Sequence, residues 1–118
     1  MSRGNSRGNS PTCELDVDSI PILTGYMVKR GRFFPSWNRR YFELFISRLE
    51  YYTDDNKTVM KGCYKLHPNV LCSDDSRRHF CFRLHEAGDE IRADILYLTA
   101  SNMEEKEVWK GKINCAIF

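Results

Sequence analysis

The chain has 118 residues, 42% of them hydrophobic and 29% charged, which is the size and composition of one globular domain. Its formal net charge is only +2, which argues against a broad basic face for nucleic acid and requires any anion site to come from local clustering. The five cysteines are odd in number and form no Cys-x-x-Cys pair, and the N-terminus lacks an apolar run. We therefore expect a cytoplasmic protein with reduced thiols and no metal or cofactor, a structural zinc site being the alternative that the cysteine spacing disfavours.

The first 21 residues differ from the rest of the chain. Residues 3–6 and 7–10 repeat the tetrapeptide Arg-Gly-Asn-Ser, which offers nothing to bury, and residues 11–21 are of mixed character. This composition predicts a disordered tail and linker. The chain is accordingly divided into a tail over 1–21 and one domain over 22–118.

From Thr24 onward, short runs of β-branched and aromatic residues alternate with turn residues, a pattern typical of an antiparallel sandwich or barrel. Tight turns are expected wherever Gly, Pro, Asn and Asp cluster between these runs. The predicted strands cover residues 24–32, 37–46, 48–54, 59–66, 69–73, 78–86 and 92–100.

The last segment has a helical period. Ser101 and Glu104 have the spacing of a capping box, so Ser101 is the predicted N-cap. An apolar stripe follows at i, i+4, i+7 and i+8, typical of an amphipathic helix that closes one end of a barrel. The stripe consists of Trp109, Ile113, Ala116 and Ile117. The sequence stops within this stripe, as it would if the chain were a segment of a longer protein.

Two cations have the parity of core residues. In the second predicted strand Phe42, Leu44 and Ile46 mark the core face, and Arg40 shares their parity. Lys29 has the core parity of the first strand. Burying either cation without a partner costs several kcal/mol, so we expect both at the open mouth of the barrel, directed at an anion from solvent.

Turns of a meander alternate between ends, which brings further polar residues to the same mouth. Together they supply the cationic and phenolic donors that a phosphorylated headgroup needs. The alternative is that these are ordinary solvated strand ends. The predicted headgroup-binding residues are Lys29, Arg30, Arg32, Arg40, Tyr51, Lys57 and Lys61. The adjacent Phe33 and Phe34 either insert into a headgroup layer or pack back onto the barrel.

The ordered set of motifs resembles a pleckstrin-homology (PH) domain over residues 22–118. It runs from Gly25-Tyr26-Met27-Val28-Lys29-Arg30-Gly31 and Trp37-Asn38-Arg39-Arg40-Tyr41-Phe42 to Trp109 in the terminal helix. The resemblance implies seven antiparallel strands in two packed sheets of four and three, capped by the helix, with the loop near 87–91 joining the mouth.

Phosphoinositide-binding members of this family show a Lys, a nearby Gly, and then a basic-x-Arg-x-Phe run. Lys29, Gly31, Arg40 and Phe42 match, whereas Asn38 stands where the first basic residue belongs. Acidic residues in the mouth loops also oppose phosphate: Asp54, Asp55, Asp89 and Glu90. Broad binding of anionic lipid is therefore as compatible with the sequence as a selective site.

The resemblance implies a non-catalytic module, recruited peripherally to membranes, that binds phosphoinositide or other anionic phospholipid headgroups. No nucleophile elbow, P-loop or paired-carboxylate pattern points to an enzyme. The alternative function is a protein-interaction scaffold, because the same fold supports many functions. The run from Arg39 to Glu50 also resembles the PH domains of G-protein-coupled receptor kinases, which use lipid and a protein partner together.

Overall fold

The computed structural model describes residues 17–31, 36–88 and 95–117. A short 3-10 turn at Val17–Ser19 precedes seven strands and one helix, in the order that the sequence predicts. The strands are β1 (Leu23–Arg30), β2 (Trp37–Leu44), β3 (Arg48–Tyr52), β4 (Met60–Lys65), β5 (Val70–Asp75), β6 (Cys81–Glu86) and β7 (Leu96–Thr99), and the helix is α1 (Met103–Ile117).

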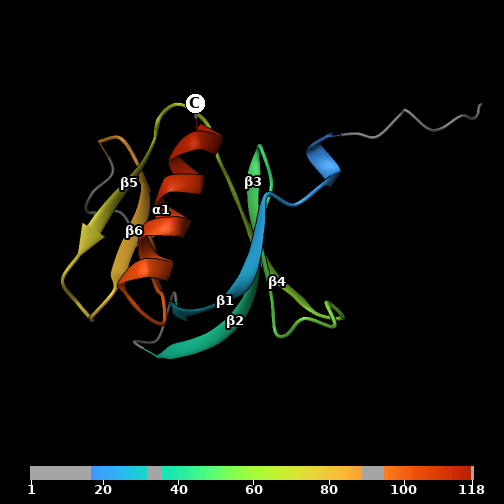
Figure 1. The fold of residues 1–118 in the computed structure, drawn as a ribbon, viewed down its shortest axis with the longest axis horizontal. Coiled ribbons are helices and arrows are strands. Elements are labelled where there is room, and N and C mark those ends of the chain that lie inside the picture. The colour runs from blue at the N-terminus through green and yellow to red at the C-terminus, as the bar shows by residue number, and fades with distance from the viewer. Residues whose placement is uncertain (1–16, 32–35, 89–94, 118) are drawn as a thin grey trace, which may run out of the picture.

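All seven strands belong to one antiparallel sheet, in the order β4-β3-β2-β1-β7-β6-β5, which curls into a half-barrel. The expectation of two separate sheets is corrected here, because β1 pairs with β2 along its whole length and also with β7 at Val28↔Thr99 and Lys29↔Leu98. The twist of adjacent strands curls so wide a sheet. Figure 1 shows α1 between the β5–β6 part of the sheet and the β1–β4 part.

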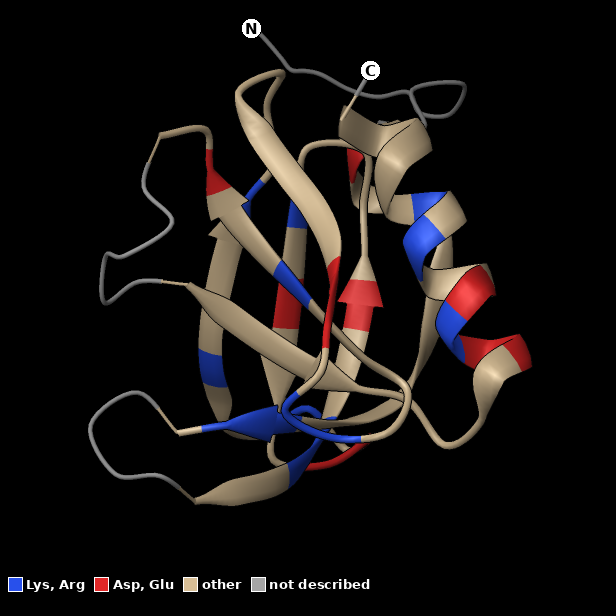
Figure 2. Ribbon diagram, turned by 90° about the vertical axis from the view of Figure 1, so that its left-hand side faces the viewer, with Lys and Arg blue, Asp and Glu red and all other residues tan. Residues whose placement is uncertain are grey.

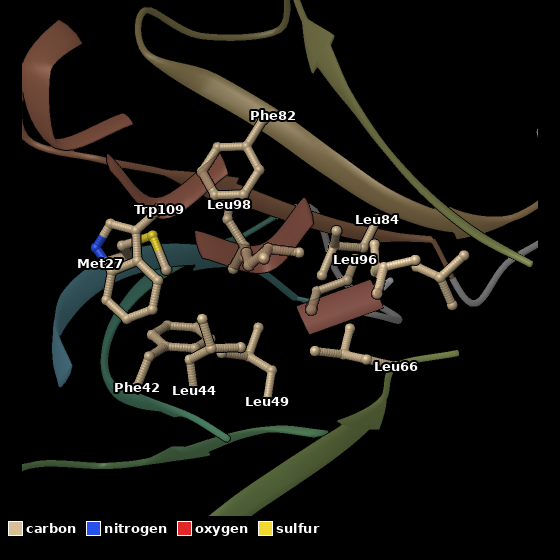
Figure 3. Packing of buried hydrophobic residues seen from close by; sticks show 13 residues of the cluster. Met27, Phe42, Leu44, Leu49, Leu66, Phe82, Leu84, Leu96, Leu98 and Trp109 are labelled. Atoms are coloured by element: carbon tan, nitrogen blue, oxygen red, sulfur yellow. The ribbon is translucent and has the colours of Figure 1, made fainter. Parts of the chain in front are cut away.

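The core lies inside the curl and is closed by the helix. Its fully buried side chains come from both parts of the sheet, and the predicted helical stripe meets them, with Trp109, Ile113 and Ile117 all buried. The rings of Trp109 and Phe42 have centroids 6.4 Å apart in an edge-on arrangement. Figure 3 shows Trp109, Met27 and Phe42 packed at one end of this cluster. The barrel and its helical cap therefore share one core.

Two local predictions need correction. The N-cap of α1 is Asn102, not Ser101, because the Asn102 side-chain oxygen accepts a hydrogen bond from the Glu105 amide at 2.8 Å. Ile46 is not a core residue: β2 ends at Leu44, and Ile46 lies exposed in the tight turn that follows. Both errors are shifts of one or two residues at the end of an element.

Helix α1 is also tied to the sheet by charge. Asp74 of β5 accepts hydrogen bonds from Lys106 at 2.9 Å and Lys110 at 2.7 Å. These two lysines lower the pKa of the Asp74 carboxyl, Lys110 more than Lys106. The contact fixes the middle of the helix against the edge strand of the sheet.

Candidate functional site

The inward-facing residues Lys29 and Tyr51 meet at the mouth of the barrel. The Lys29 ammonium lies 5.2 Å from the centroid of the Tyr51 ring and donates to the Arg30 carbonyl oxygen at 3.1 Å. Tyr51 packs in turn on Phe42, its register partner on β2, with ring centroids 5.3 Å apart. The predicted inward parity of both residues is confirmed, and a cation is held over the face of a ring anchored in the core.

Gly62 provides the space in which Tyr51 lies. The two residues are paired across β3 and β4, and a methyl group added at Gly62 would lie 2.3 Å from the Tyr51 hydroxyl oxygen. Any larger residue at this position therefore displaces the ring. The glycine is required by close packing, and this requirement fixes the floor beneath Lys29.

A cavity of about 430 Å³ opens beside this pair, within the size range of small-molecule sites. It is called the mouth pocket below. Three of the predicted headgroup-binding residues, Lys29, Arg30 and Tyr51, line it. Lys65, His67 and Glu86 line it as well. The His67 ring and the Glu86 carboxylate are 2.6 Å apart, so one acidic group faces the cations. The full lining is Lys29, Arg30, Tyr51, Cys63, Tyr64, Lys65, His67, Glu86, Ile95 and Leu96.

Lys57 does not reach the mouth pocket. Its ammonium donates to a Glu43 carboxylate oxygen at 2.9 Å and lies 5.4 Å from the Tyr52 ring centroid. The Glu43 side chain is only 7% exposed, so Lys57 supplies the counter-charge for a buried carboxylate. The hydrogen bond to Glu43 raises the pKa of Lys57. Lys57 is therefore paired on the other face of the sheet, and its part in headgroup binding stays a prediction.

Arg40 and Lys61 also stay outside the lining of the mouth pocket. Arg40 is half-buried and its guanidinium donates to the Arg39 carbonyl oxygen at 3.0 Å. Lys61 is exposed on β4. Arg32, Phe33 and Phe34 lie outside the described residues, so their roles remain predictions.

A family model described as PH domain matches residues 21–118. The chain belongs to the PH domain family. PH domains are generally non-catalytic modules. No helix in the described residues has the length and apolar character needed to cross a bilayer.

Known PH domains resemble this one in sequence and in fold. Pleckstrin of Homo sapiens is 27% identical over 99 residues, which cover 81% of this chain and 27% of pleckstrin. The solution structure of the PH domain of human KIAA0053 protein is 28% identical with a TM-score of 0.70, covering 92% of this chain and 93% of that one. The chain spans as little as 11% of other curated relatives.

Several similar structures contain a ligand, among them a domain of pleckstrin. The crystal structure of the C-terminal PH domain of pleckstrin in complex with D-myo-Ins(1,2,3,4,5)P5 has a TM-score of 0.67 and 24% identity, covering 84% of this chain and all of that one. At this identity the likeness is one of fold. The bound molecule is a property of the pleckstrin domain.

The charges of this PH domain are unevenly placed. In Figure 2 the end of β1 beside the grey 32–35 segment is blue, while the first turns of α1 are largely red. Of the acidic residues expected to oppose phosphate, Asp54 accepts a hydrogen bond from the Asn56 amide at 3.1 Å and so shapes its own turn. The Asp55 amide donates to the Tyr26 hydroxyl at 3.0 Å. Asp89 and Glu90 lie outside the described residues.

Sequence reasoning missed Lys65 and His67 at the mouth pocket. Lys65 ends β4, and His67 lies in the connection to β5. Their closeness to Lys29 depends on how the curled sheet brings its ends together, and no residue pattern within either segment signals it.

Proposed function

We propose that this PH domain is a non-catalytic module that binds the phosphorylated headgroup of a phosphoinositide or another anionic phospholipid at the cytoplasmic surface of a membrane. The observation that carries the proposal is the Lys29 ammonium held over Tyr51 in the mouth pocket. Because the Lys29 ammonium is already held beside a phenol, little side-chain freedom is lost when it binds a phosphate. The charge-assisted hydrogen bonds that it donates therefore contribute more to the affinity.

The other groups around the mouth pocket suit the same ligand class. Arg30 and Lys65 add positive charge to its lining. Arg32, Arg40 and Lys61 are proposed to extend the positive rim, and Phe33 and Phe34 to contact the headgroup layer. The pleckstrin domain crystallised with an inositol pentakisphosphate supports phosphorylated inositol as the ligand class.

Broad selectivity is the version of this proposal that the charges favour. Asn38 replaces the basic residue expected beside Arg40, and Glu86 faces the lining cations. A carboxylate near the site disfavours closely packed phosphates on one ring. We therefore expect affinity to follow the density of anionic lipid more than the position of one phosphate.

Vesicle co-sedimentation tests the proposal. Phosphatidylcholine vesicles are compared with vesicles that also contain phosphatidylserine or phosphatidylinositol bisphosphate. Wild type should bind only the anionic vesicles, more weakly as salt rises, and Lys29→Ala should weaken binding at least about fivefold, since one cation near an anionic leaflet contributes roughly 1 kcal/mol.

Lys112→Ala is the matched control, because Lys112 is an exposed lysine on α1 that does not line the mouth pocket. It should bind the anionic vesicles like wild type. Equal binding to neutral and anionic vesicles, or equal losses in the two lysine variants, would contradict the proposal.

A second candidate function is binding of a protein segment. It is favoured by a groove between β1 and the start of α1, with Leu23, Val108 and Trp109 among its apolar residues. Val108 is 44% exposed, so its side chain is accessible to a segment that lies in the groove. Val108→Asp should remove such binding and leave vesicle binding intact, whereas Lys29→Ala should do the reverse.

A further inference from the structure

Two arginines, Arg39 on β2 and Arg78 in the turn between β5 and β6, lie over aromatic rings. The Arg39 guanidinium carbon is 3.7 Å from the Tyr26 ring centroid, and that of Arg78 is 4.8 Å from the Trp37 ring centroid. Neither forms an ion pair with a carboxylate among the described residues, and both are exposed. Stacking restrains a guanidinium while leaving its N–H edge directed outward, where it can pair with an oxyanion.

Both arginines line one small pocket, called the arginine pocket below. Its volume is about 160 Å³, less than organic ligands occupy but enough for a single charged group. No acidic residue is among its lining: Tyr26, Met27, Val28, Arg39, Arg78, Thr99, Ala100 and Ser101. Two guanidiniums thus line one half-open pocket, and a guanidinium is the side-chain group that pairs best with a phosphate.

The arginine pocket opens into the groove between β1 and α1. Tyr26, Arg39 and Ser101 line both. The groove has a volume of about 580 Å³ and follows β1 back to Leu23. From Val28 to Leu23 a strand rises roughly 17 Å, the length of about five extended residues. The combined shape fits a short extended segment with one charged group at its end.

Beyond Arg39, the charged residues that line the groove are acidic. Glu104 and Glu105, both exposed in the first turn of α1, line it, and neither forms an ion pair with Arg39. A ligand that spans both regions needs a negative group at one end and a positive group a few residues away. These glutamates would repel an anionic bilayer laid against this side, so the charges favour a peptide over a membrane.

We infer that this side of the domain binds a protein segment carrying a phosphoserine or phosphothreonine, with a Lys or Arg within about four residues of it. The phosphate pairs with Arg39 and Arg78, and the basic side chain meets Glu104 and Glu105. A short phosphorylated side chain fits because the backbone of the segment runs in the adjoining groove. This site is separate from the mouth pocket, with which it shares no lining residue.

A peptide library provides the test. Immobilised domain is offered peptides with a central phosphoserine and degenerate flanking positions, and the same peptides with serine. Wild type should retain the phosphorylated set and enrich Lys or Arg within four positions of the phosphate. Arg39→Gln and Arg78→Gln should each weaken retention about tenfold or more, since a charge-assisted hydrogen bond contributes roughly 1.5–3 kcal/mol.

Arg77→Gln is the matched control. Arg77 belongs to the same turn as Arg78, but its guanidinium donates to the Tyr97 hydroxyl at 2.8 Å and pairs with Asp75 at 3.4 Å. It should retain the phosphorylated peptides like wild type. Glu104→Gln combined with Glu105→Gln should keep the preference for phosphate and lose the enrichment of Lys or Arg. Circular dichroism and thermal unfolding verify that every variant is folded.

Several outcomes would overturn the inference. The proposed site would be ruled out if the domain retained phosphorylated and unphosphorylated peptides equally. It would also be ruled out if Arg77→Gln and Arg78→Gln weakened retention to the same extent. If folded Arg78→Gln loses vesicle binding instead of peptide binding, the arginine pocket serves a lipid headgroup. If serine phosphate alone competes as well as the peptides do, the groove contributes nothing. Lys29→Ala should leave peptide retention unchanged, so failure of the lipid proposal and failure of this one are distinguishable.

Discussion

Two regions of this domain hold their cations in different ways. On the outer face of β2 and β3, Lys57 and Arg48 are paired with the carboxylates of Glu43 and Glu50 at 2.9 and 2.6 Å. On the two sides of β1, Lys29 lies over Tyr51, and Arg39 lies over Tyr26. Both regions are basic in sequence, and they differ in what holds the cation in place: a carboxylate in the first region and an aromatic ring in the second.

The difference separates cations that are paired within the fold from cations that we propose to bind a ligand. In the carboxylate region burial favours the neutral form of Glu50, but hydrogen bonds from Arg48 and Tyr52 outweigh this and lower its pKa. The pKa of the Tyr52 hydroxyl is raised by burial and by its hydrogen bond to Glu50. Such a network is internally satisfied. A ring, by contrast, restrains a guanidinium without neutralising it.

The largest effect on stability is expected from replacing Trp109, the helical residue that packs against β1 and β2 in the core. Trp109→Ala should lower the free energy of unfolding by about 3–5 kcal/mol, because a buried indole is replaced by a cavity beside Phe42 and Gly25. Urea denaturation measures this. Val108→Ala, one residue away and exposed, is the control and should change stability far less. Equal losses would contradict the central place of Trp109.

Gly62→Ala should disturb the mouth pocket without changing any charge. The added methyl group would overlap the Tyr51 hydroxyl, so the ring must move away from its position beneath Lys29. We expect a stability loss of about 1–3 kcal/mol, as for other overpacked sites, together with weaker binding to anionic vesicles. Gly111→Ala, where nothing lies near the added atom, should instead keep vesicle binding and raise the stability by up to about 1 kcal/mol, because alanine favours the helix interior. If folded Gly62→Ala bound anionic vesicles as well as wild type does, Tyr51 would not belong to the binding site.

Lys57→Met tests whether a cation that is paired within the fold contributes to stability but not to vesicle binding. It leaves the buried Glu43 carboxylate without its ion pair, and we expect a stability loss of about 1 kcal/mol, moderated because the Lys57 side chain is 42% exposed. Vesicle binding should change much less than in Lys29→Ala. Lys112→Met, at an exposed lysine of α1 with no ion pair among the described residues, is the control for the lost charge. If Lys57→Met lost more vesicle binding than Lys29→Ala, Lys57 and not Lys29 would be the cation that contributes more to headgroup binding.

The smallest effect is expected from Asp74→Asn, which removes the acceptor for Lys110 and Lys106. Because the folded state lowers the pKa of Asp74 below its ordinary value of 3.8, the carboxylate stabilises the fold above that pH, by no more than about 1 kcal/mol at this exposed site. The contribution is lost as the pH falls through the lowered pKa. Thermal unfolding should therefore show a difference between wild type and variant at pH 7 that disappears in acid. A constant difference would rule out the ion pairs as its source.

The order of elements and the buried face of α1 could be predicted from the sequence because both depend on local periodicity. Strand alternation also placed Lys29 and Tyr51 on the inner face. The pairing of Lys57 with Glu43 could not be predicted, since 14 positions separate them and the contact depends on how the turn after β3 folds back over β2. The alternation of residues along a strand predicts the face of the sheet on which a side chain lies, but not which neighbouring side chain it contacts.

The stacking of Arg39 on Tyr26 shows the same limit. In the observed register Arg39 pairs with Val28, so Tyr26 is its diagonal neighbour on the same face. Arg39 has the parity opposite to that of Arg40, and the sequence alone therefore gave it no place at the mouth. Only the register of β1 against β2 shows that this outward direction leads to an aromatic ring.

The pairing of β1 with β7 has a consequence for how the chain folds. Val28 and Thr99 lie about 70 positions apart in the sequence, and the sheet becomes continuous only when these two strands meet. Closing so long a loop is entropically costly and precedes the contacts that compensate for it. We expect refolding on the millisecond-to-second timescale typical of topologies dominated by distant contacts. On a ribosome, β1 would remain without its second neighbour until nearly the whole domain had emerged.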